Sequence, residues 1–428
     1  MKHRSTNILT VLILLGLVGG AFVGEFGLYA TGAVVDGDHW LKAAGDLVLI
    51  RPLKLLIIPL IFFSVISGIT RIGDPSKLGI VGGATLIYYL ATMFMAVTLG
   101  TLLVTWISPG VLAPEIQETL RETAGNFTAG ETATRSLGSA WMNILYQLVP
   151  VNIFADMVNV RPLGIIMFAI AFGLALAAGG EKTKVARDLC NACFEGLMIL
   201  VRWVIWLTPI GVFFLVAWTV GKIGFESIVG PLGWYMTTVL LGLAIHGFLV
   251  LPLVLWLFSG KDPFQFMWQM KRALMTAIGT DSSSATLPVT IDAAEGEGGC
   301  SKRAANFVLP LGATINMDGT ALYEAVAVVF LFQLFGIQLE FGQLLIVVIT
   351  ATLAAIGAAG IPSAGLVTMV IVISAVNMNL TGSPDGPLPV AAIGIIIGVD
   401  RILDMCRTAV NVWGDAVGAK IITRIAPD

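Results

Sequence analysis

Five polar residues repeat along one face of an apolar segment near the end of the chain. Asp400, Asp404, Arg407, Asn411 and Asp415 are separated by four, three, four and four residues, which places them on a single stripe of a helix. A charged side chain at the centre of a bilayer costs at least about 2.5 kcal/mol, so such residues face a partner or a wet cavity and mark a substrate or ion path. A structural ion pair between Asp404 and Arg407 is the simpler alternative, but it does not require Asn411 and Asp415 on the following turns.

Two stretches before and around this segment share one pattern, in which an interrupted apolar hairpin precedes a helix with polar residues. The first hairpin lies at about 263–294 and its helix at about 303–333, whereas the second hairpin lies at about 341–376 and precedes the polar stripe. Paired interruptions of apolar segments indicate a transporter site formed between two repeats. The positions of the loop residues indicate that the hairpins enter from opposite faces of the membrane, the first from the cytoplasm.

The interruptions carry residues suited to a zwitterion with a second carboxylate. The Ser-rich break at 280–284 offers hydroxyl groups and helix N-terminal amides, which favour an anion. The Gly-rich break at 357–365 lets the backbone approach a ligand and provides a hinge, with close packing of small residues as the alternative explanation. The break at 316–319 frees carbonyl oxygens beside a carboxylate, which suits Na⁺. Arg407 can grip a carboxylate through two hydrogen bonds, and Asp404 suits an ammonium group.

Length and composition indicate a membrane protein. Of the 428 residues, 57% are hydrophobic and 12% are charged, against about a quarter charged in soluble proteins. Apolar runs long enough to span a bilayer recur at about 8–33, 44–70, 79–107, 163–180, 189–221 and 228–258. The first run is too long for the apolar core of a signal peptide and lacks a clear cleavage site. The net charge of −3 gives no electrostatic support for a nucleic-acid partner.

Basic residues gather in alternate loops and predict the orientation of the chain. Lys and Arg are concentrated near residues 2–4, 71–77, 182–187, 261–272, 302–303 and 420–424, whereas the loops near 36–38 and 115–122 are acidic. By the positive-inside rule, both termini are cytoplasmic. We therefore expect a multi-pass protein in the lipid bilayer of the cell inner (plasma) membrane.

Cysteine and histidine residues do not form a recognisable metal site. Cys190 and Cys193 are one helical turn apart, but no His or further Cys lies near them in the sequence. His3, His39 and His246 are scattered along the chain, which argues against metal binding.

Four segments resemble the signature sequences of the glutamate/aspartate:cation symporters, which comprise the excitatory amino acid transporters and their prokaryotic homologues. The segments are DSSSATLP at 281–288, GATINMDGT at 312–320, GAAGIP at 357–362 and DMCRTAVNVWGD at 404–415. The resemblance extends over essentially the whole chain, and four motifs in this order are highly specific to this family of dicarboxylate/amino acid:cation symporters.

This resemblance implies an all-α polytopic membrane protein with eight transmembrane helices, two re-entrant helical hairpins related as inverted repeats, and an elevator-type mechanism. It also implies a homotrimer. Scaffold helices 1 and 2 would occupy residues 1–78, transport-domain helix 3 residues 79–108, and an outer loop with scaffold helices 4 and 5 residues 109–222. The rest of the transport domain would occupy 223–428, with helix 6, hairpin 1 at about 263–294, helix 7 at about 303–333, hairpin 2 at about 341–376 and helix 8 at about 388–424.

The resemblance also implies roles for individual residues. Arg407 would grip the side-chain carboxylate of the substrate, and Asp404 would take its amino group. The other implied substrate contacts are Ser283, Thr320, Thr408 and Asn411, with Ile361 and Gly365 of the second hairpin closing over them. The three implied Na⁺ sites comprise Gly312, Asn316, Asn411 and Asp415; Thr314, Ala355, Ile356 and Ala358; and Tyr89, Thr92, Asn316 and Asp318.

Several positions depart from the family pattern or leave a role open. Met93 replaces a hydroxyl residue of the third Na⁺ site, Asp281 stands where prokaryotic members usually carry Arg, and Met405 lacks the arginine of the animal transporters. Asp400 belongs to the polar stripe but has no implied role. Glu324 matches the carboxylate that carries a proton in the animal transporters, and it predicts proton co-transport; a carboxyl group that is hydrogen-bonded without titrating is the alternative.

We therefore expect a sodium-coupled secondary active symporter that imports L-aspartate or L-glutamate, and not an enzyme. A proton-coupled C4-dicarboxylate carrier of the same fold is the close alternative, but its members tend to lose the carboxylate at Asp415. A neutral amino acid exchanger would be expected to replace Arg407, and a receptor without transport is a further possibility. An intramembrane aspartyl protease built on Asp318 and Asp415 is disfavoured by the nearby Arg407 and by Val412, which replaces a glycine of the Gly-x-Gly-Asp motif.

Overall fold

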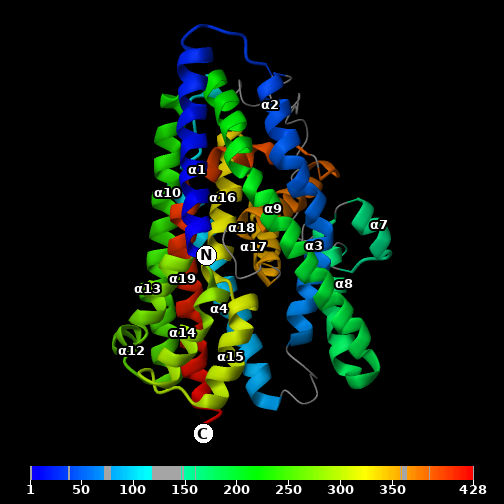
Figure 1. Ribbon diagram of the computed structural model, residues 1–428, viewed down its shortest axis with the longest axis vertical. Helices are drawn as coiled ribbons and strands as arrows, with labels where there is room; N and C mark the ends of the chain where they lie inside the picture. The colour runs from blue at the N-terminus through cyan, green and yellow to red at the C-terminus, as the bar shows by residue number, and fades with distance from the viewer. Residues whose placement is uncertain are drawn as a thin grey trace.

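The computed structural model describes residues 2–36, 39–71, 79–117, 146, 149–159, 161–356, 358, 364–384 and 386–427, and every regular element among them is a helix. Most of the helices run lengthwise along one axis (Figure 1). Seven helical stretches in these residues are long and apolar enough to cross a membrane. They are Val11–Tyr29, Trp40–Thr70, Ile80–Ile107, Gly180–Ile223, Glu226–Ser259, Lys302–Leu334 and Ala364–Thr381. The expected multi-pass membrane architecture is confirmed.

Contacts between helices divide the described elements into two groups, and the long helix α9 organises the first. This group contains α1 (Lys2–Phe22), η1 (Val23–Tyr29), α2 (Trp40–Gly45), η2 (Asp46–Ile50), α3 (Arg51–Arg71), α7 (Ile153–Val158), α8 (Pro162–Ala178), η4 (Gly180–Thr183) and α9 (Lys184–Ile223). Helix α9 packs against α1, α2 and α3, and α3 also packs against α8. Helix α9 begins before the expected apolar run at 189, because residues 184–188, three of which are charged, continue the helix beyond the apolar segment.

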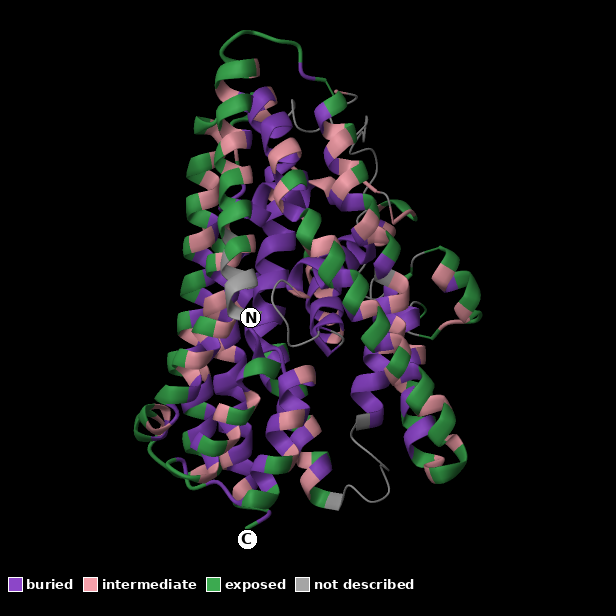
Figure 2. Cartoon of the chain, viewed as in Figure 1, coloured by how far each residue is buried: buried purple, intermediate pink, exposed green. Residues whose placement is uncertain are grey.

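The second group is built around α16. It contains α4 (Gly79–Ile107), α10 (Glu226–Ile245), η5 (His246–Val250), α11 (Leu251–Ser259), α12 (Pro263–Gln269), α13 (Lys271–Thr280), α14 (Ser283–Glu295), α15 (Lys302–Ile315), α16 (Asp318–Leu334), α17 (Phe341–Ile356), α18 (Ala364–Thr381), η6 (Val390–Ile393) and α19 (Gly394–Thr423). Helix α16 packs against α4, α10, α17, α18 and α19. Every residue of α16 except Gln333 is buried, and this interior appears as the purple centre of Figure 2.

Three interruptions of helices bring irregular backbone into this second group. Helix α13 ends at Thr280, and Asp281 takes a left-handed conformation with φ 54° before Ser282 caps α14. Helix α15 ends at Ile315, and α16 begins only at Asp318. Helix α17 ends before the third break and α18 follows it. The expected breaks within 280–284 and 316–319 are therefore observed, while residues 357 and 359–363 of the third lie outside the described residues.

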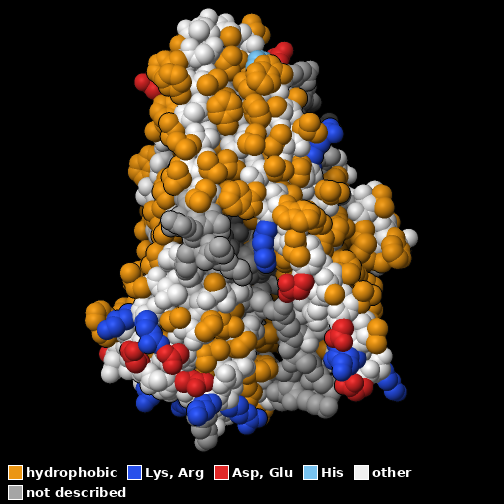
Figure 3. Space-filling view, viewed as in Figure 1, with side chains coloured by type: hydrophobic (Ala, Val, Ile, Leu, Met, Phe, Trp, Pro, Cys, Tyr) orange, Lys and Arg blue, Asp and Glu red, His pale blue; other side chains and the backbone are white. Residues whose placement is uncertain are grey.

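The surface separates an apolar belt from a charged end. In Figure 3 hydrophobic side chains cover the upper and middle parts of the visible face, while Lys, Arg, Asp and Glu gather at its lower end. The C-terminus and the helices α12, α13 and α14 lie toward that end in Figure 1. An apolar belt of this kind matches the hydrocarbon core of a bilayer, and charged residues are stable where the chain leaves it.

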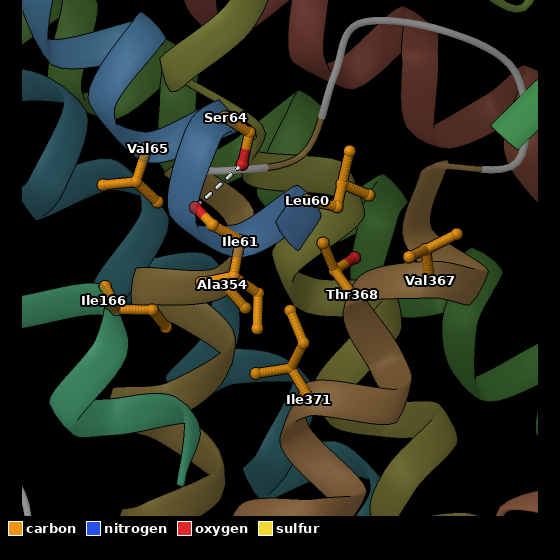
Figure 4. Close-up of a pocket in the computed structure, with 9 residues that line it drawn as sticks. All are labelled: Leu60, Ile61, Ser64, Val65, Ile166, Ala354, Val367, Thr368 and Ile371. Carbon is orange, nitrogen blue, oxygen red and sulfur yellow. Dashed lines mark hydrogen bonds between the residues drawn. The ribbon is translucent and has the colours of Figure 1, made fainter. Parts of the chain in front are cut away.

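The border between the two groups is lined mainly by apolar side chains. Figure 4 shows a narrow pocket there, with room for about one water molecule, between helices of the first group and helices α17 and α18. Its lining residues are Leu60, Ile61, Ser64, Val65, Ile166, Ala354, Val367, Thr368 and Ile371. The Ser64 hydroxyl donates to the Ile61 carbonyl oxygen of its own helix at 3.2 Å. At this pocket, the two groups therefore meet mainly through apolar contacts and not through hydrogen bonds.

Within the first group, small residues let α1 and α9 approach closely. Gly16, Gly20 and Gly24 are spaced by four residues along α1 and η1, and a Cβ atom on any of them would meet the backbone of α9. On Gly24 it would lie 2.7 Å from the Ala217 carbonyl oxygen. Small residues at this spacing are the common means by which membrane helices pack at short distance.

We predict that Gly24→Val lowers the melting temperature of the purified protein in detergent. The added side chain must push η1 away from α9, and overpacking of this kind costs about 1–3 kcal/mol. Gly27→Val is the matched control, because a Cβ atom on Gly27 meets only Val23 of its own helix, at 3.7 Å. Equal melting temperatures for the two variants would show that the close approach of α1 and α9 does not stabilise the protein.

Candidate functional site

The polar stripe lies on α19, and all five of its side chains are buried. Helix α19 packs against α13, α14, α15 and α16, so its polar face meets the interrupted helices. The Trp413 indole N–H donates to the Gly247 carbonyl oxygen at 3.0 Å and ties α19 to the π-helical turn η5. The helix therefore presents its charges to the protein interior, as the spacing predicted.

Arg407 is surrounded by two carboxylates and an aromatic ring. Its Nη1 lies 2.7 Å from Asp400 Oδ1, and its Nε lies 2.8 Å from Asp404 Oδ1. The guanidinium carbon lies 4.2 Å from the centre of the Tyr323 ring, a cation–π contact. Its side chain is 1% exposed, and its Nη2 has no hydrogen-bond partner among the described residues. Asp400, whose role the sequence left open, is thus a direct partner of Arg407.

The free arm of Arg407 faces the start of α18. A Cβ atom on Gly365 would lie 3.4 Å from Arg407 Nη2 and 3.3 Å from Thr320 Cγ2, so the glycine keeps this space open. The Asn411 amide donates to the Thr320 hydroxyl at 3.1 Å and accepts from the Gly319 N–H at 2.7 Å. The structure therefore brings together Thr320, Gly365, Arg407 and Asn411 of the expected substrate set.

The remaining members of that set are less closely connected. Ser283 opens α14, which packs against α19, and both Ser283 and Thr408 are buried. Asp404 joins the set through Arg407. Ile361 lies outside the described residues.

A second polar cluster lies between α4, the break after α15, and α19. The Asn316 amide donates to Asp415 Oδ1 at 3.1 Å, and the Thr92 hydroxyl donates to Asn316 Oδ1 at 3.4 Å. Gly312 faces the same place, because a Cβ atom there would contact Asp415 Oδ1 and lie 3.0 Å from the Tyr89 hydroxyl. The structure thus brings together residues of the first and third expected Na⁺ sites, and the donors are the hard oxygen atoms that such ions prefer.

Asp318 adds an unsatisfied carboxylate oxygen to this cluster. Its Oδ1 is buried and has no hydrogen-bond partner among the described residues, while its Oδ2 lies 3.3 Å from His246 Nε2. A buried carboxylate oxygen without a partner is costly, and a cation would satisfy it. The three histidines are scattered in the sequence, but the fold places one of them, His246 of the π-helical turn η5, against Asp318. Met93, the expected departure in this region, is fully buried.

The residues of the second expected Na⁺ site make no hydrogen bonds that join α15 to α17 within the described part of the chain. Thr314 donates its hydroxyl to the Leu311 carbonyl oxygen at 3.1 Å, and the Ala358 N–H donates to the Ala355 carbonyl oxygen at 3.1 Å. The ends of α15 and α17 do lie near each other, because a Cβ atom on Gly68 would meet both Ile315 and Ile356 within 4 Å. Carbonyl groups in the last turn of a helix lack intrahelical partners and remain available to a ligand.

Glu324 lies in α16 with its side chain fully buried. The Thr368 hydroxyl of α18 donates to Glu324 Oε1, whereas Oε2 has no hydrogen-bond partner among the described residues. Thr368 also lines the border pocket in Figure 4, so this carboxyl group is one residue away from the contact with the first group. The sequence does not predict this partner, because Thr368 lies in α18, the second arm of the second hairpin, 44 residues after Glu324.

The chain is similar to known membrane transporters along nearly its whole length. The model of the sodium:dicarboxylate symporter family matches residues 9–425. The chain is 38% identical to excitatory amino acid transporter 3 of Oryctolagus cuniculus, an alignment that covers 97% of this chain and 84% of that protein. It is 37% identical to neutral amino acid transporter B(0) of Homo sapiens, over 97% of this chain and 80% of that protein. It is also 37% identical to an excitatory amino acid transporter of Caenorhabditis elegans, over 97% and 87%.

We predict that Gly312→Ala abolishes stabilisation of the purified protein by NaCl. In the wild type, NaCl should raise the melting temperature above that in equal choline chloride, because an ion that binds only the folded state stabilises it. The added methyl group would occupy the space beside Asp415. Gly247→Ala is the control, since its Cβ atom would meet Val410 at an ordinary 3.6 Å. A full NaCl effect in Gly312→Ala would remove this cluster as a cation site.

Proposed function

Because the chain belongs to the sodium:dicarboxylate symporter family, a family of membrane transporters and not of enzymes, we propose that it is a sodium-coupled symporter that imports the acidic amino acids L-aspartate and L-glutamate. The observation that carries the proposal is the free Nη2 of Arg407, which points into the space kept open by Gly365. A substrate carboxylate at this position would complete the coordination of the guanidinium, and buried charge-assisted pairs of this kind are strong.

The remaining substrate groups have partners nearby. Asp404 would take the amino group of the substrate, while Thr320, Thr408 and Asn411 supply hydroxyl and amide groups for the main carboxylate. We assign Ser283 and Ile361 to the two hairpin tips that close over the ligand. Gly365 belongs to the same closure.

Transport of neutral amino acids is the second candidate function, because a neutral amino acid transporter is among the similar proteins. A buried arginine without an anionic ligand argues against it, since the free donor would stay unsatisfied when a neutral side chain bound. A proton-coupled C4-dicarboxylate carrier is disfavoured by Asp404, which suits an amino group, and by Asp415.

We propose that Na⁺ is bound as a co-substrate in three places. The first comprises backbone carbonyls at Gly312, Asn316 and Asn411 with the Asp415 carboxylate, and the third comprises Tyr89, Thr92, Asn316 and Asp318. The second comprises carbonyl groups of Thr314, Ala355, Ile356 and Ala358. The orphan Oδ1 of Asp318 and the glycine at 312 support the polar cluster as an ion site.

We propose that Glu324 carries a proton in addition. Glu324 is fully buried, and among the described residues its carboxyl group accepts one hydrogen bond, from the neutral Thr368 hydroxyl, which leaves room for a proton on the other oxygen. Asp318 lies nearer the oxygen-rich cluster, so the two acidic residues would divide the binding of H⁺ and Na⁺.

The two groups of helices support an elevator-type mechanism. We assign residues 1–78 and 109–222 to a scaffold that holds a homotrimer, and residues 79–108 and 223–428 to a transport domain that moves across the bilayer. The proposal includes eight transmembrane helices, two re-entrant hairpins and cytoplasmic termini. Its structural support is that the helices pack more extensively within each group than between the groups.

The function is tested by uptake of labelled L-aspartate and L-glutamate into proteoliposomes. Gradients of Na⁺, H⁺ and K⁺ are imposed one at a time. Ions and substrate that bind together must raise each other's affinity equally, so apparent aspartate affinity should fall steeply as Na⁺ is lowered. Uptake that is equally fast in choline with only a pH gradient would refute sodium coupling and favour the dicarboxylate carrier.

We predict that Arg407→Cys lowers the apparent affinity for aspartate at least about 100-fold, the loss expected for a buried charged pair worth about 3 kcal/mol. The variant should admit small neutral amino acids such as serine or alanine. Competition with labelled substrate measures both effects. Arg272→Cys, which removes an exposed arginine of hairpin 1, is the control and should retain aspartate uptake. Unchanged aspartate affinity in Arg407→Cys would exclude the arginine from the site.

We predict that aspartate uptake by the wild type carries protons inward and is faster when the exterior is acidic. Glu324→Gln should mimic the protonated carboxyl group, so exchange of bound aspartate persists while the pH dependence between about 5.5 and 8 disappears. A pH-sensitive dye inside the liposomes measures the proton flux. Glu340→Gln, which changes an exposed acidic residue before α17, should leave the pH dependence intact. A wild-type rate that is independent of pH, without proton flux, would make Glu324 a structural residue.

A further inference from the structure

An ion pair joins the tip of the first hairpin to α19 beside the proposed substrate site. Arg401 Nη1 lies 2.5 Å from Asp281 Oδ2. Asp281 caps the C-terminus of α13 with φ 54°, and its side chain is fully buried. Aspartate tolerates this backbone conformation better than most residues, but a buried carboxylate requires a cation. Arg401 supplies that cation from the position next to Asp400.

Arg401 also lies in surroundings where its charge requires a partner. Its side chain is 16% exposed and lines a small pocket where α19 meets the first group of helices. The pocket walls are mostly apolar, and the polar residues beside Arg401 in the lining are Thr208 and Asp400, of which Asp400 is already paired with Arg407. An unpaired guanidinium would be costly in this place, so each member of the pair permits the burial of the other.

The pair changes the charge next to the substrate. Asp281, Asp400 and Asp404 contribute three carboxylates, and Arg401 and Arg407 contribute two guanidinium groups, so these three ion pairs together carry one net negative charge. An acidic amino acid brings one further negative charge. Without Arg401, the site would present a second uncompensated carboxylate to an anionic ligand.

We propose that Arg401 is a positioning residue for the transport of acidic substrates, which acts through Asp281. It neutralises the carboxylate at the hairpin tip and holds that tip, two residues before Ser283, against α19. The inference rests on the proposed function, because it concerns the binding of an anionic amino acid. It assigns to Arg401 and Asp281 opposite and mutually compensating effects on substrate affinity.

The experiment compares Arg401→Met, Asp281→Asn and the double variant in full-length protein. Binding of L-aspartate and of Na⁺ alone is measured by titrating the melting temperature. Arg401→Met should weaken aspartate binding about tenfold, the order of magnitude that Coulomb's law gives for one uncompensated charge about 10 Å away at an effective dielectric constant of about 20. The same variant should bind Na⁺ as well as the wild type or more tightly, because added negative charge attracts a cation. The double variant restores the net charge and should regain most of the aspartate affinity.

Two controls separate this role from general damage to the fold. Arg424→Met removes an exposed cation from the end of α19, where its guanidinium donates to the Phe258 carbonyl oxygen at 3.0 Å, and should change neither affinity. Arg401→Lys keeps the charge and should bind aspartate nearly as tightly as the wild type. If Arg401→Met does not fold, Asp281→Asn decides the question, since it removes a negative charge and should bind aspartate more tightly than the wild type.

Opposite outcomes overturn the proposal. Arg401→Met that weakens aspartate and Na⁺ binding equally would indicate a structural role, as would a double variant no better than Arg401→Met. Weaker aspartate binding by Asp281→Asn would contradict the charge argument. A wild type that binds no aspartate in Na⁺ would refute the proposed function itself, whereas normal wild-type binding with unchanged variants would refute only this inference.

Discussion

Buried backbone N–H and C=O groups require hydrogen-bond partners, and the interrupted helices of the second group depend on side chains that supply them. Helix α16 begins in the middle of the buried region, so its first N–H groups lack intrahelical acceptors. Asn411 Oδ1 accepts from Gly319 N–H at 2.7 Å and from Thr320 N–H at 3.4 Å. At the first hairpin, Ser282 caps α14 in the same way. The break before α16 is therefore tolerated because the polar stripe of α19 supplies hydrogen-bond partners. The same stripe provides groups that can bind a ligand.

The charges of the stripe are mutually dependent. Arg407 contacts Asp400 and Asp404, and Arg401 contacts Asp281, so each carboxylate near the substrate position has a guanidinium beside it. Removing one member of a buried pair costs more than the pair contributes, because the remaining charge is left without compensation. The arrangement explains why Asp400 continues the stripe although the family resemblance implies no substrate contact for it.

Local features of the site could be predicted from the sequence, and contacts between distant segments could not. The stripe follows from helical periodicity, and the breaks at 280–284 and 316–319 follow from runs of polar and small residues. The pairing of His246 with Asp318 and of Thr368 with Glu324 joins helices that are separated by 72 and 44 residues. Such contacts depend on how η5, α16 and α18 pack. The number of spans is similarly hard to predict from apolar segments, because α19, which carries the charged stripe, is not among the seven described helical stretches that are apolar enough to cross a membrane.

The contrast between two helix interfaces bears on movement within the protein. Helices α1 and α9 meet through glycines, so their backbones are in contact and any sliding would produce clashes. At the border in Figure 4, the lining is mainly aliphatic, and the hydroxyl groups that reach it, Ser64 and Thr368, bond within their own groups. Contacts between aliphatic side chains are non-directional, so a displacement along the border exchanges them at little cost. Under the proposed elevator-type mechanism, this aliphatic border is the interface along which the second group would move against the first.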